Sequence, residues 1–462
     1  MSAASILGGF AAFVPDLSPG YLLALLVPIV QTLGMAAGGM LIACLAGLPL
    51  GLVVATRAPG TRLLYQLLAG LRAIPDLTLA ILCVVVFGIG PAAGLFALAL
   101  FYTAMIGKVF ADLFLAAERR PLDALRATGA SRTAVALFGL IPLRLGDLIT
   151  HGCYSLECAV RAAVIVGAVG GGGLGTELVG TLNAFDYRRA VTLVLVLILI
   201  MAGLDHLSWR VRRAPKLVLL LIPVGAAALW IYRPQLLAVE HALRTFGSML
   251  PPRLPAEALL ALPRLLGETL LIAGAGTALG ALAALPLGLA SARNLAPPAL
   301  VAVTRAVLEA LRAVPEVVWG LILVSLATVG PRAGIVALAL HSAGVLGKLY
   351  AESFENVRPE ALRAVEATGA SRLSVAGFAL VPLAAGPIAV HSLFRLEWNL
   401  RAATVVGMIG AGGIGEALYE AQQLFFYQQM MAYVLITWIV VSAADALSQR
   451  TQLRLGCATV PA

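Results

Sequence analysis

The sequence predicts an all-α polytopic membrane protein that contains two copies of one domain. Its 462 residues are 61% hydrophobic and 12% charged, whereas soluble domains are about 45–50% apolar and about 25% charged. Apolar runs of the ~20 residues that cross a bilayer as a helix recur throughout the chain. Blocks of sequence also return at a fixed distance along the chain. A duplicated membrane domain is therefore expected.

The duplication is an ungapped repeat with an offset of 240 residues. Leu71-Arg-Ala-Ile-Pro-Asp76 returns as Leu311-Arg-Ala-Val-Pro-Glu316, and Thr128-Gly-Ala-Ser-Arg132 returns as Thr368-Gly-Ala-Ser-Arg372. About two positions in five are identical between the copies, and upstream of these motifs the offset is 237. A period of this length is far above that of small-repeat solenoids. It indicates two whole domains that run in the same direction.

Five apolar spans are expected in each domain. In the first copy they cover residues 32–56, 67–87, 92–117, 135–154 and 190–207. A further apolar run, 217–232, lies between the copies, and the second copy repeats the set from about 265 to 447. We therefore expect eleven spans: a first transmembrane domain at 21–213, a linker with an extra span at 214–255, and a second transmembrane domain at 256–455.

Basic residues indicate which loops are cytoplasmic. They cluster in three loops of the first copy: Arg57 and Arg62; Arg119, Arg120, Arg126 and Arg132; and Arg210, Arg212, Arg213 and Lys216. By the positive-inside rule these loops face the cytoplasm. An odd number of spans would invert the second copy, and the extra span restores its orientation, so the copies are expected to lie parallel. The net charge of +9 then reflects topology, and no nucleic acid partner is expected.

Two cytoplasmic segments, 118–135 and 358–375, are polar, favour a short helix and are then broken by Thr-Gly. On composition alone each is more simply explained as a plain connector. The spacing of Ala124, Gly129 and Pro142, repeated at 364, 369 and 382, resembles the EAA loop of ATP-binding-cassette (ABC) importer permeases. In that family the loop forms a coupling helix that sits in a groove of the ATPase subunit. The resemblance implies these coupling residues: Asp123, Ala124, Gly129, Ala130, Ser131, Arg132, Ala364, Gly369, Ala370, Ser371 and Arg372.

The two loops differ at the first position of this motif. The family has Glu there, whereas this sequence has Asp123 in the first copy and Arg363 in the second. The two copies are therefore expected to grip the two ATPase subunits unequally.

The sequence that follows each loop resembles the phosphonate importer permeases (PhnE type). The second copy is the closer match and reads Trp398-Asn-Leu-Arg-Ala-Ala-Thr-Val-Val-Gly-Met-Ile-Gly-Ala-Gly-Gly-Ile-Gly415. Methionine-type permeases share the Gly-rich stretch 167–175, and the element of Glu157 with Arg161-Ala-Ala163 before it favours the phosphonate group. The resemblance implies two type I (MetI-like) permease domains of five spans fused in one chain, with phosphonate or a related phosphorus oxyanion as the substrate.

Charged residues recur at helical spacing inside the apolar spans. The i, i+4 pairs are Lys108 with Asp112, Glu157 with Arg161, Lys348 with Glu352, and Glu397 with Arg401. Such groups cost ~2.5–3.5 kcal/mol in a span and are kept where they meet a partner or an aqueous cavity. The Lys pairs are more simply internal ion pairs, whereas the two Arg precede a Gly-rich tract and are expected to line the translocation path. The residues assigned to the path or its gate are Lys108, Glu157, Arg161, Lys348, Glu397 and Arg401.

The Gly-rich tracts 170–175 and 410–415 have two interpretations. Glycine permits backbone conformations closed to other residues, and irregular backbone at membrane depth survives where protein or water covers it, so the tracts could form a movable segment at the outer mouth. Alternatively, they only allow helices to approach closely. Because consecutive glycines weaken a helix beyond what packing requires, we assign Gly170, Gly172, Gly410 and Gly412 to a gate.

Motifs for chemistry are absent from the sequence. It has no P-loop, no His-Glu-x-x-His zinc motif and no nucleophile elbow. No catalytic or metal-binding residue is therefore assigned, and the chain is not expected to be an enzyme. The resemblance implies that ATP and Mg²⁺ bind to separate ATPase subunits, so that this chain itself needs no cofactor.

These features together predict the multi-pass permease of an ABC importer in the lipid of the bacterial inner membrane. Such a permease binds an ATPase dimer on the cytoplasmic side and receives substrate from a periplasmic binding protein. Import is expected to follow alternating access, with the anion passing between the copies. The alternatives are a methionine-type or other small-solute importer and a gradient-driven secondary transporter with a duplicated core.

Overall fold

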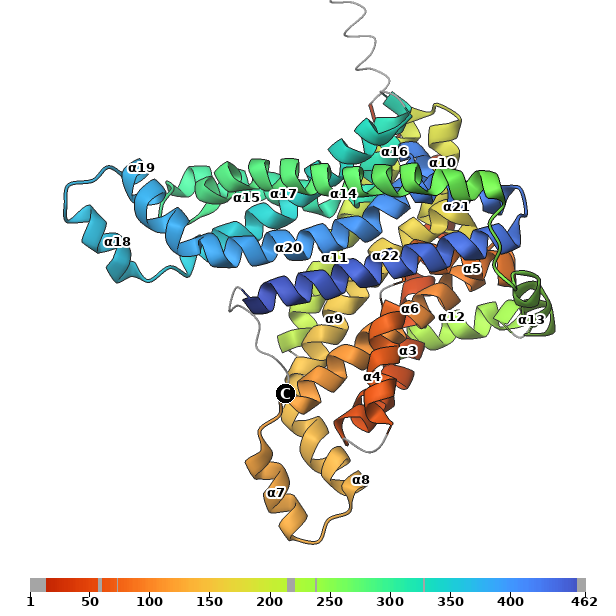
Figure 1. Ribbon diagram of the computed structural model, residues 1–462, viewed down its shortest axis with the longest axis horizontal. Coiled ribbons are helices and arrows are strands. Elements are labelled where there is room, and N and C mark those ends of the chain that lie inside the picture. Colours follow the sequence, from red (N-terminus) through yellow and green to blue (C-terminus); the bar gives the residue numbers. More distant parts are fainter. Residues whose placement is uncertain are drawn as a thin grey trace, which may run out of the picture. The chain divides into compact units, whose positions relative to one another are not determined.

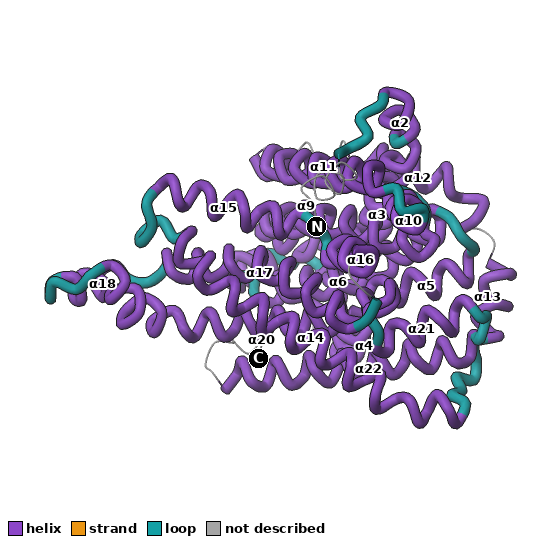
Figure 2. Tube along the Cα trace, turned by 90° about the horizontal axis from the view of Figure 1, so that it is seen from above, coloured by secondary structure: helices purple, strands orange, loops and turns teal. Residues whose placement is uncertain are grey.

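The computed structural model describes residues 14–56, 60–72, 74–213, 221–236, 239–326 and 329–454. Within these ranges all regular secondary structure is helical. The chain divides into two compact units, Met1–Ser248 (unit 1) and Met249–Ala462 (unit 2), and Figures 1 and 2 show both built from helices. The predicted all-α duplicated fold is confirmed.

Unit 1 contains four long helices joined by shorter ones (Figure 1). The long helices are α3 (Leu26–Ala55), α6 (Pro91–Leu115), α9 (Ile141–Val166) and α11 (Tyr187–Arg213). The short elements are α2 (Pro19–Ala24), α4 (Thr61–Arg72), α5 (Asp76–Phe87), α7 (Arg119–Ala127), α8 (Arg132–Ala134), the π-helical turns η1 (Val135–Leu140) and η2 (Gly167–Gly171), α10 (Leu174–Asn183), α12 (Leu221–Leu236) and α13 (Val239–Ser248).

Unit 2 repeats the order of unit 1 from α3 to α11. Its long helices are α14 (Ala256–Ser291), α17 (Pro331–Glu355), α20 (Val381–Val406) and α22 (Tyr427–Arg454). Between them lie α15 (Pro298–Ala313), α16 (Glu316–Leu326), α18 (Pro359–Glu366), α19 (Arg372–Val375), the π-helical turns η4 (Ala376–Leu380) and η5 (Gly407–Ala411), and α21 (Gly413–Gln423). The sequence repeat is thus a repeat of structure as well.

The first long helix of each unit packs along the second: α3 along α6, and α14 along α17. Glycines on the first helix allow this close contact. A Cβ added to Gly47 would lie 2.9 Å from Ile106 Cγ2, and one added to Gly280 would lie 2.5 Å from Ser342 Cβ. Small residues at helix contacts are typical of membrane bundles, because lipid tails are as apolar as the side chains and close packing must hold the helices together.

The second expected span of each repeat consists of two helices. In unit 1, α4 and α5 meet at 87° beside Pro75. In unit 2, α15 ends at Ala313 and α16 begins directly after Pro315. Proline lacks the N–H that a helix interior requires and pushes the preceding residue out of the helical region. The predicted continuous span 67–87 is therefore interrupted at Pro75.

Eight helices in the described ranges are long and apolar enough to cross a membrane, or nine if the bent α4–α5 pair forms one span. The apolar part of α12, Ile222–Tyr232, is shorter than these, and α12 packs against α3 of the same unit. The count of eleven spans therefore stays a prediction.

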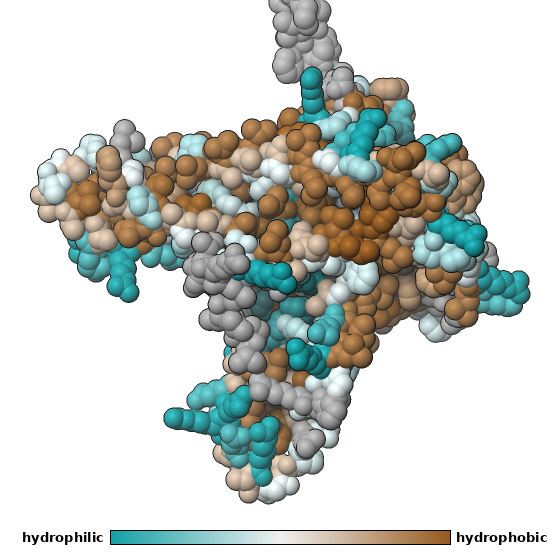
Figure 3. All heavy atoms as spheres, viewed as in Figure 1, coloured by the Kyte–Doolittle hydropathy of each residue, from teal (hydrophilic) through white to brown (hydrophobic). Residues whose placement is uncertain are grey.

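Apolar side chains cover the outside of the long helices, as Figure 3 shows for one face. Leu45, Leu199 and Leu260 are 67%, 70% and 82% exposed, and extended apolar surfaces of this kind are rare on soluble proteins. Hydrophilic side chains gather instead around α7 and α18. The long helices therefore suit a lipid environment, and the loops that carry α7 and α18 suit water.

Candidate functional site

The first predicted coupling loop begins with an amphipathic helix, α7. Leu122 is buried, and its Cδ2 would lie 3.0 Å from a Cβ added to Gly139 of η1, so this face of α7 packs on unit 1. Asp123 and Ala124 lie on the exposed face. Asp123 forms a salt bridge of 2.9 Å with Arg126, and both side chains are well exposed. A solvated pair of this kind contributes little to stability, so the exposed face of α7 remains available for a partner.

The second loop has the same design with different charges. Leu362 of α18 packs against the buried cluster that includes Leu380, while Arg363 and Ala364 are exposed. Arg363 stands where the first loop has Asp123, so the exposed faces of α7 and α18 carry opposite charges at this position. The side chains of Arg132 and Arg372, which the sequence also assigns to coupling, lie outside the described residues.

Both short helices end in the same left-handed turn. Gly129 has φ +82° and Gly369 has φ +78°, and each glycine N–H donates to the carbonyl three residues earlier at 2.9 Å. Glycine is favoured at this position of a helix end. Ala130 and Ala370 follow half-buried. The hydroxyls of Ser131 and Ser371 then accept the N–H three residues on, at 3.2 and 3.3 Å, which starts the next helix.

The Gly-rich tracts are breaks in the helices that follow. The four predicted gate residues all have φ outside the usual region: +103° at Gly170, +81° at Gly172, +104° at Gly410 and +92° at Gly412. An L side chain in this region costs roughly 1–2 kcal/mol. The neighbouring Gly175 instead permits close approach, because a Cβ there would overlap the Val164 carbonyl oxygen. The two interpretations of the tract thus apply to different glycines, and the gate assignment stays a prediction.

Side chains of the first long helix clamp the chain after each break. In unit 1, Gln31 Oε1 and Thr32 Oγ1 accept the N–H groups of residues 173 and 174 at 3.0 and 2.9 Å. In unit 2, Glu268 Oε2 and Thr269 Oγ1 accept the corresponding N–H groups at 3.1 and 3.0 Å. The first backbone N–H groups of any helix have no partner within the helix, and the clamp provides acceptors for two of them in each unit. The clamp was not predicted, although Thr32 and Thr269 recur at the offset of 237.

The two Lys pairs differ between the units. Lys108 Nζ lies 3.3 Å from Asp112 Oδ2, and the Tyr65 hydroxyl donates to Asp112 Oδ1 at 2.9 Å. Lys348 and Glu352 are exposed, and no ion pair joins them in the described part of the chain. The structure thus brings together the first predicted pair and leaves the second apart.

The two Arg pairs also differ between the units, but here the ion pair forms in unit 2. An ion pair joins Arg401 Nη2 to Glu397 Oε1, and the two side chains are only 14% and 7% exposed. Glu157 and Arg161 occupy the same positions on α9, but among the described residues no ion pair links them. The sequence predicts the same contact in both copies, and the structure makes it in unit 2.

Unit 2 also contains a buried polar network that was not predicted from the sequence. His341 Nε2 lies 3.6 Å from Glu316 Oε2, and the indole N–H of Trp398 donates to Glu316 Oε1 at 3.4 Å. Asn399, fully buried, donates to Ser342 Oγ at 2.8 Å. The network joins α16, α17 and α20. Its signal in the sequence was that His341, Trp398 and Asn399 lie in apolar spans where the first copy has Phe101, Cys158 and Ala159.

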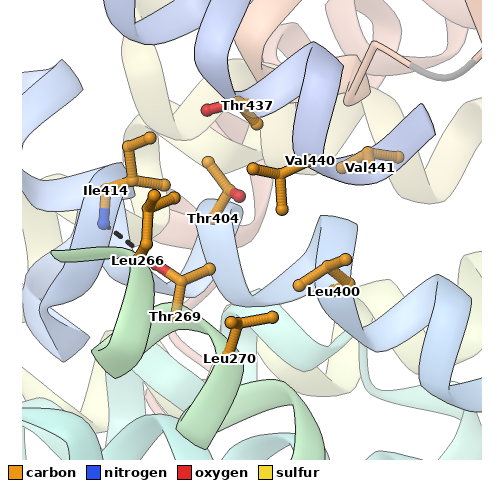
Figure 4. Close-up of a pocket in the computed structure, with 9 residues that line it drawn as sticks. All are labelled: Leu266, Thr269, Leu270, Leu400, Thr404, Ile414, Thr437, Val440 and Val441. Atoms are coloured by element: carbon orange, nitrogen blue, oxygen red, sulfur yellow. Dashed lines mark hydrogen bonds between the residues drawn. The ribbon is translucent and has the colours of Figure 1, made fainter. Parts of the chain in front are cut away.

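A small pocket lies in unit 2 where α14, α20, α21 and α22 meet (Figure 4). Its lining is Leu266, Thr269, Leu270, Leu400, Thr404, Ile414, Thr437, Val440 and Val441. The volume of about 10 Å³ is about the space that one water molecule needs. The pocket is therefore too small for an organic or phosphorus-containing substrate. It is a small gap in the packing beside Thr269 of the clamp.

Two threonines of this pocket provide a matched test of the clamp. Thr269→Val removes the acceptor of the Ile414 N–H (Figure 4), and an unsatisfied buried donor costs about 1–3 kcal/mol. Thr437 Oγ1 is buried with no hydrogen-bond partner among the described residues, so Thr437→Val is expected to be neutral or slightly stabilising. Thermal unfolding of the purified protein in detergent measures both. Equal midpoints for the two variants would contradict the clamp.

The matches to known proteins agree with this duplicated site. Residues 47–214 and 284–455 each match the family of the binding-protein-dependent transport system inner membrane component. The chain belongs to this family. The permease is thus the membrane-spanning subunit of an ABC importer in the inner membrane, and the family implies a separate ATPase and a substrate-binding protein as partners. The predicted resemblance, the function as a permease and its non-enzymatic nature are confirmed.

Relatives of the permease differ in how much of it they match. The phosphate-import permease protein PhnE of Mycolicibacterium smegmatis is 32% identical over 92% of this chain and 85% of its own. The phosphite transport system permease protein PtxC of Stutzerimonas stutzeri is 39% identical over 39% of this chain and 66% of its own. The putative cryptic phosphonate transport system permease protein PhnE2 of Escherichia coli is 42% identical over 25% of this chain and 95% of its own. The similarity to the mycobacterial protein thus extends through both repeats.

Proposed function

We propose that the permease imports a phosphorus oxyanion, such as phosphate, phosphite or a phosphonate. The proposal is carried by the similarity, along 92% of the chain, to a permease named for phosphate import. Shorter relatives named for phosphite and phosphonate transport support it. The half-buried Arg161 on α9 also supports it, because a guanidinium pairs well with phosphate-like oxygens.

In this proposal, the two domains at 21–213 and 256–455, joined by the linker at 214–255, form one transport unit. The exposed loops of α7 and α18 dock the two subunits of an ATPase dimer on the cytoplasmic side. ATP and Mg²⁺ bind to that dimer, and a periplasmic binding protein delivers the oxyanion. The breaks at Gly170, Gly172, Gly410 and Gly412 change conformation when the path opens to either side.

Reconstituted transport tests the proposal. The full chain would be purified with its ATPase, placed in proteoliposomes and supplied with the binding protein. Uptake of radiolabelled inorganic phosphate and methylphosphonate would then be measured with and without ATP. We expect uptake of at least one of the two that requires ATP and the binding protein. Uptake of neither compound, with uptake of methionine or another small solute, would overturn the substrate assignment. Uptake driven by an ion gradient alone would overturn the ATP-driven mechanism.

A further inference from the structure

The network of unit 2 holds Arg401 in place. Arg401 donates to Glu397, and its guanidinium carbon lies 5.6 Å from the ring centroid of Trp398. Trp398 in turn donates to Glu316 at 3.4 Å, and Glu316 lies beside His341 at 3.6 Å. The guanidinium is therefore fixed by an ion pair and by an indole that is itself anchored to a second helix.

Unit 1 lacks the residues that would hold its arginine in this way. Cys158 replaces the tryptophan, and Phe101 replaces the histidine. Within the described part of the chain, Glu157 Oε1 and Arg161 Nε are buried and have no hydrogen-bond partner. Tyr102 stands where unit 2 has Ser342.

An unsatisfied buried polar atom of an ionised side chain is costly. A buried donor or acceptor without a partner costs about 1–3 kcal/mol, and a charged group costs more. Charged side chains in membrane spans are kept where a partner or a water-filled cavity receives them. What distinguishes Arg401 is the ion pair of its Nη2 with Glu397. For Arg161 and Glu157, another conformation of the transport cycle must supply a partner.

We infer that Arg161 contacts the transported oxyanion, with Glu157 beside it, whereas Arg401 is a structural residue. This inference rests on the proposed function. The guanidinium donates to the ionised oxygens of the ligand. The ionised Glu157 carboxylate has no proton to donate and can only accept hydrogen bonds. It can therefore accept a hydrogen bond from a P–OH group of the ligand. The pair therefore suits a phosphorus oxyanion that retains one proton.

The number of oxyanions imported per ATP hydrolysed separates the two roles. In the proteoliposome assay above, Arg161→Gln is expected to lower this ratio at least tenfold for phosphate or methylphosphonate, while ATPase stimulation by the binding protein and the thermal midpoint of the complex stay as in the wild type. The matched Arg401→Gln is expected to keep the ratio within about twofold and to lower the midpoint, because it leaves Glu397 buried without its ion-pair partner.

Further variants keep the test decisive. Arg161→Lys retains the charge but loses the planar fork, so it should fold and give an intermediate ratio even if Arg161→Gln fails to assemble. Glu157→Gln keeps an acceptor oxygen and should retain at least half of the ratio, whereas Glu157→Leu should lose most of it. An unchanged ratio in the Arg161 variants, or equal losses at positions 161 and 401, overturns the inference. Failure of the wild type to import either oxyanion instead overturns the proposed function.

Discussion

Gly175→Ala and Gly415→Ala are expected to prevent folding of the permease. An added Cβ would overlap the Val164 carbonyl oxygen at position 175 and the Thr404 carbonyl oxygen at position 415, in both cases much closer than the 3.0 Å that real Cβ atoms respect. These oxygens belong to the backbone of α9 and α20 and cannot rotate away. Overpacking by a flexible side chain costs about 1–3 kcal/mol. Displacement of a backbone segment costs more, and the total stability of a domain is only about 5–15 kcal/mol.

The yield of monodisperse protein in detergent and its thermal midpoint measure this effect. Gly180→Ala is the matched control, because it lies on the same helix α10 and a Cβ there meets nothing within 4 Å. Alanine inside a helix is favoured over glycine by roughly 0.5–1 kcal/mol, so the control should fold with an equal or higher midpoint. Normal yield of Gly175→Ala and Gly415→Ala would show that the helix after the break does not pack as described.

Gly129→Glu and Gly369→Glu are expected to uncouple transport from ATP hydrolysis. A side chain at either position meets nothing within 4 Å in the permease itself, so the fold should tolerate the change apart from roughly 1–2 kcal/mol of local strain at positive φ. The turn is exposed beside α7 or α18. A carboxylate there should disturb a docked ATPase by steric overlap and charge. We expect ATP-dependent uptake to fall at least tenfold, with loss of co-purified ATPase.

Asparagine separates the effect of strain from that of docking. Among residues other than glycine it tolerates the left-handed region well, and it is small and uncharged. Gly129→Asn and Gly369→Asn should therefore retain most of the uptake. Full uptake by both Glu variants, or retention of the ATPase at wild-type levels, would contradict the docking role. Because Asp123 corresponds to Arg363, the two loops need not respond equally.

The fold was predictable because its signals are local or repeated. Apolar composition identifies the membrane class, and the return of Leu71-Arg-Ala and Thr128-Gly-Ala at one offset identifies the duplication. The break beside Pro75 was missed, because the span 67–87 was predicted as continuous although proline cannot continue a helix. The positive φ of Gly170 and Gly410 follows from the same kind of local rule.

The contacts within the site were not predictable in the same way. The spacing of Glu157 and Arg161 is identical to that of Glu397 and Arg401, yet only the second pair meets in the described part of the chain. The difference depends on neighbours brought from distant helices, such as Trp398 bound to Glu316. A spacing of four residues states only that two side chains can meet. Their environment, which the local sequence does not contain, decides whether they do.

The clamp on each Gly-rich break has a consequence for the order of synthesis. Gln31 and Gly173 are 142 residues apart, and Glu268 and Gly413 are 145 residues apart. The first long helix of each unit must therefore wait until most of its unit has been made before it meets its hydrogen-bond partner. Until then, the side chains of Gln31 and Glu268 have no donor from the break. We expect each half to become resistant to proteolysis late and in one step, with the first half maturing before the second has left the ribosome.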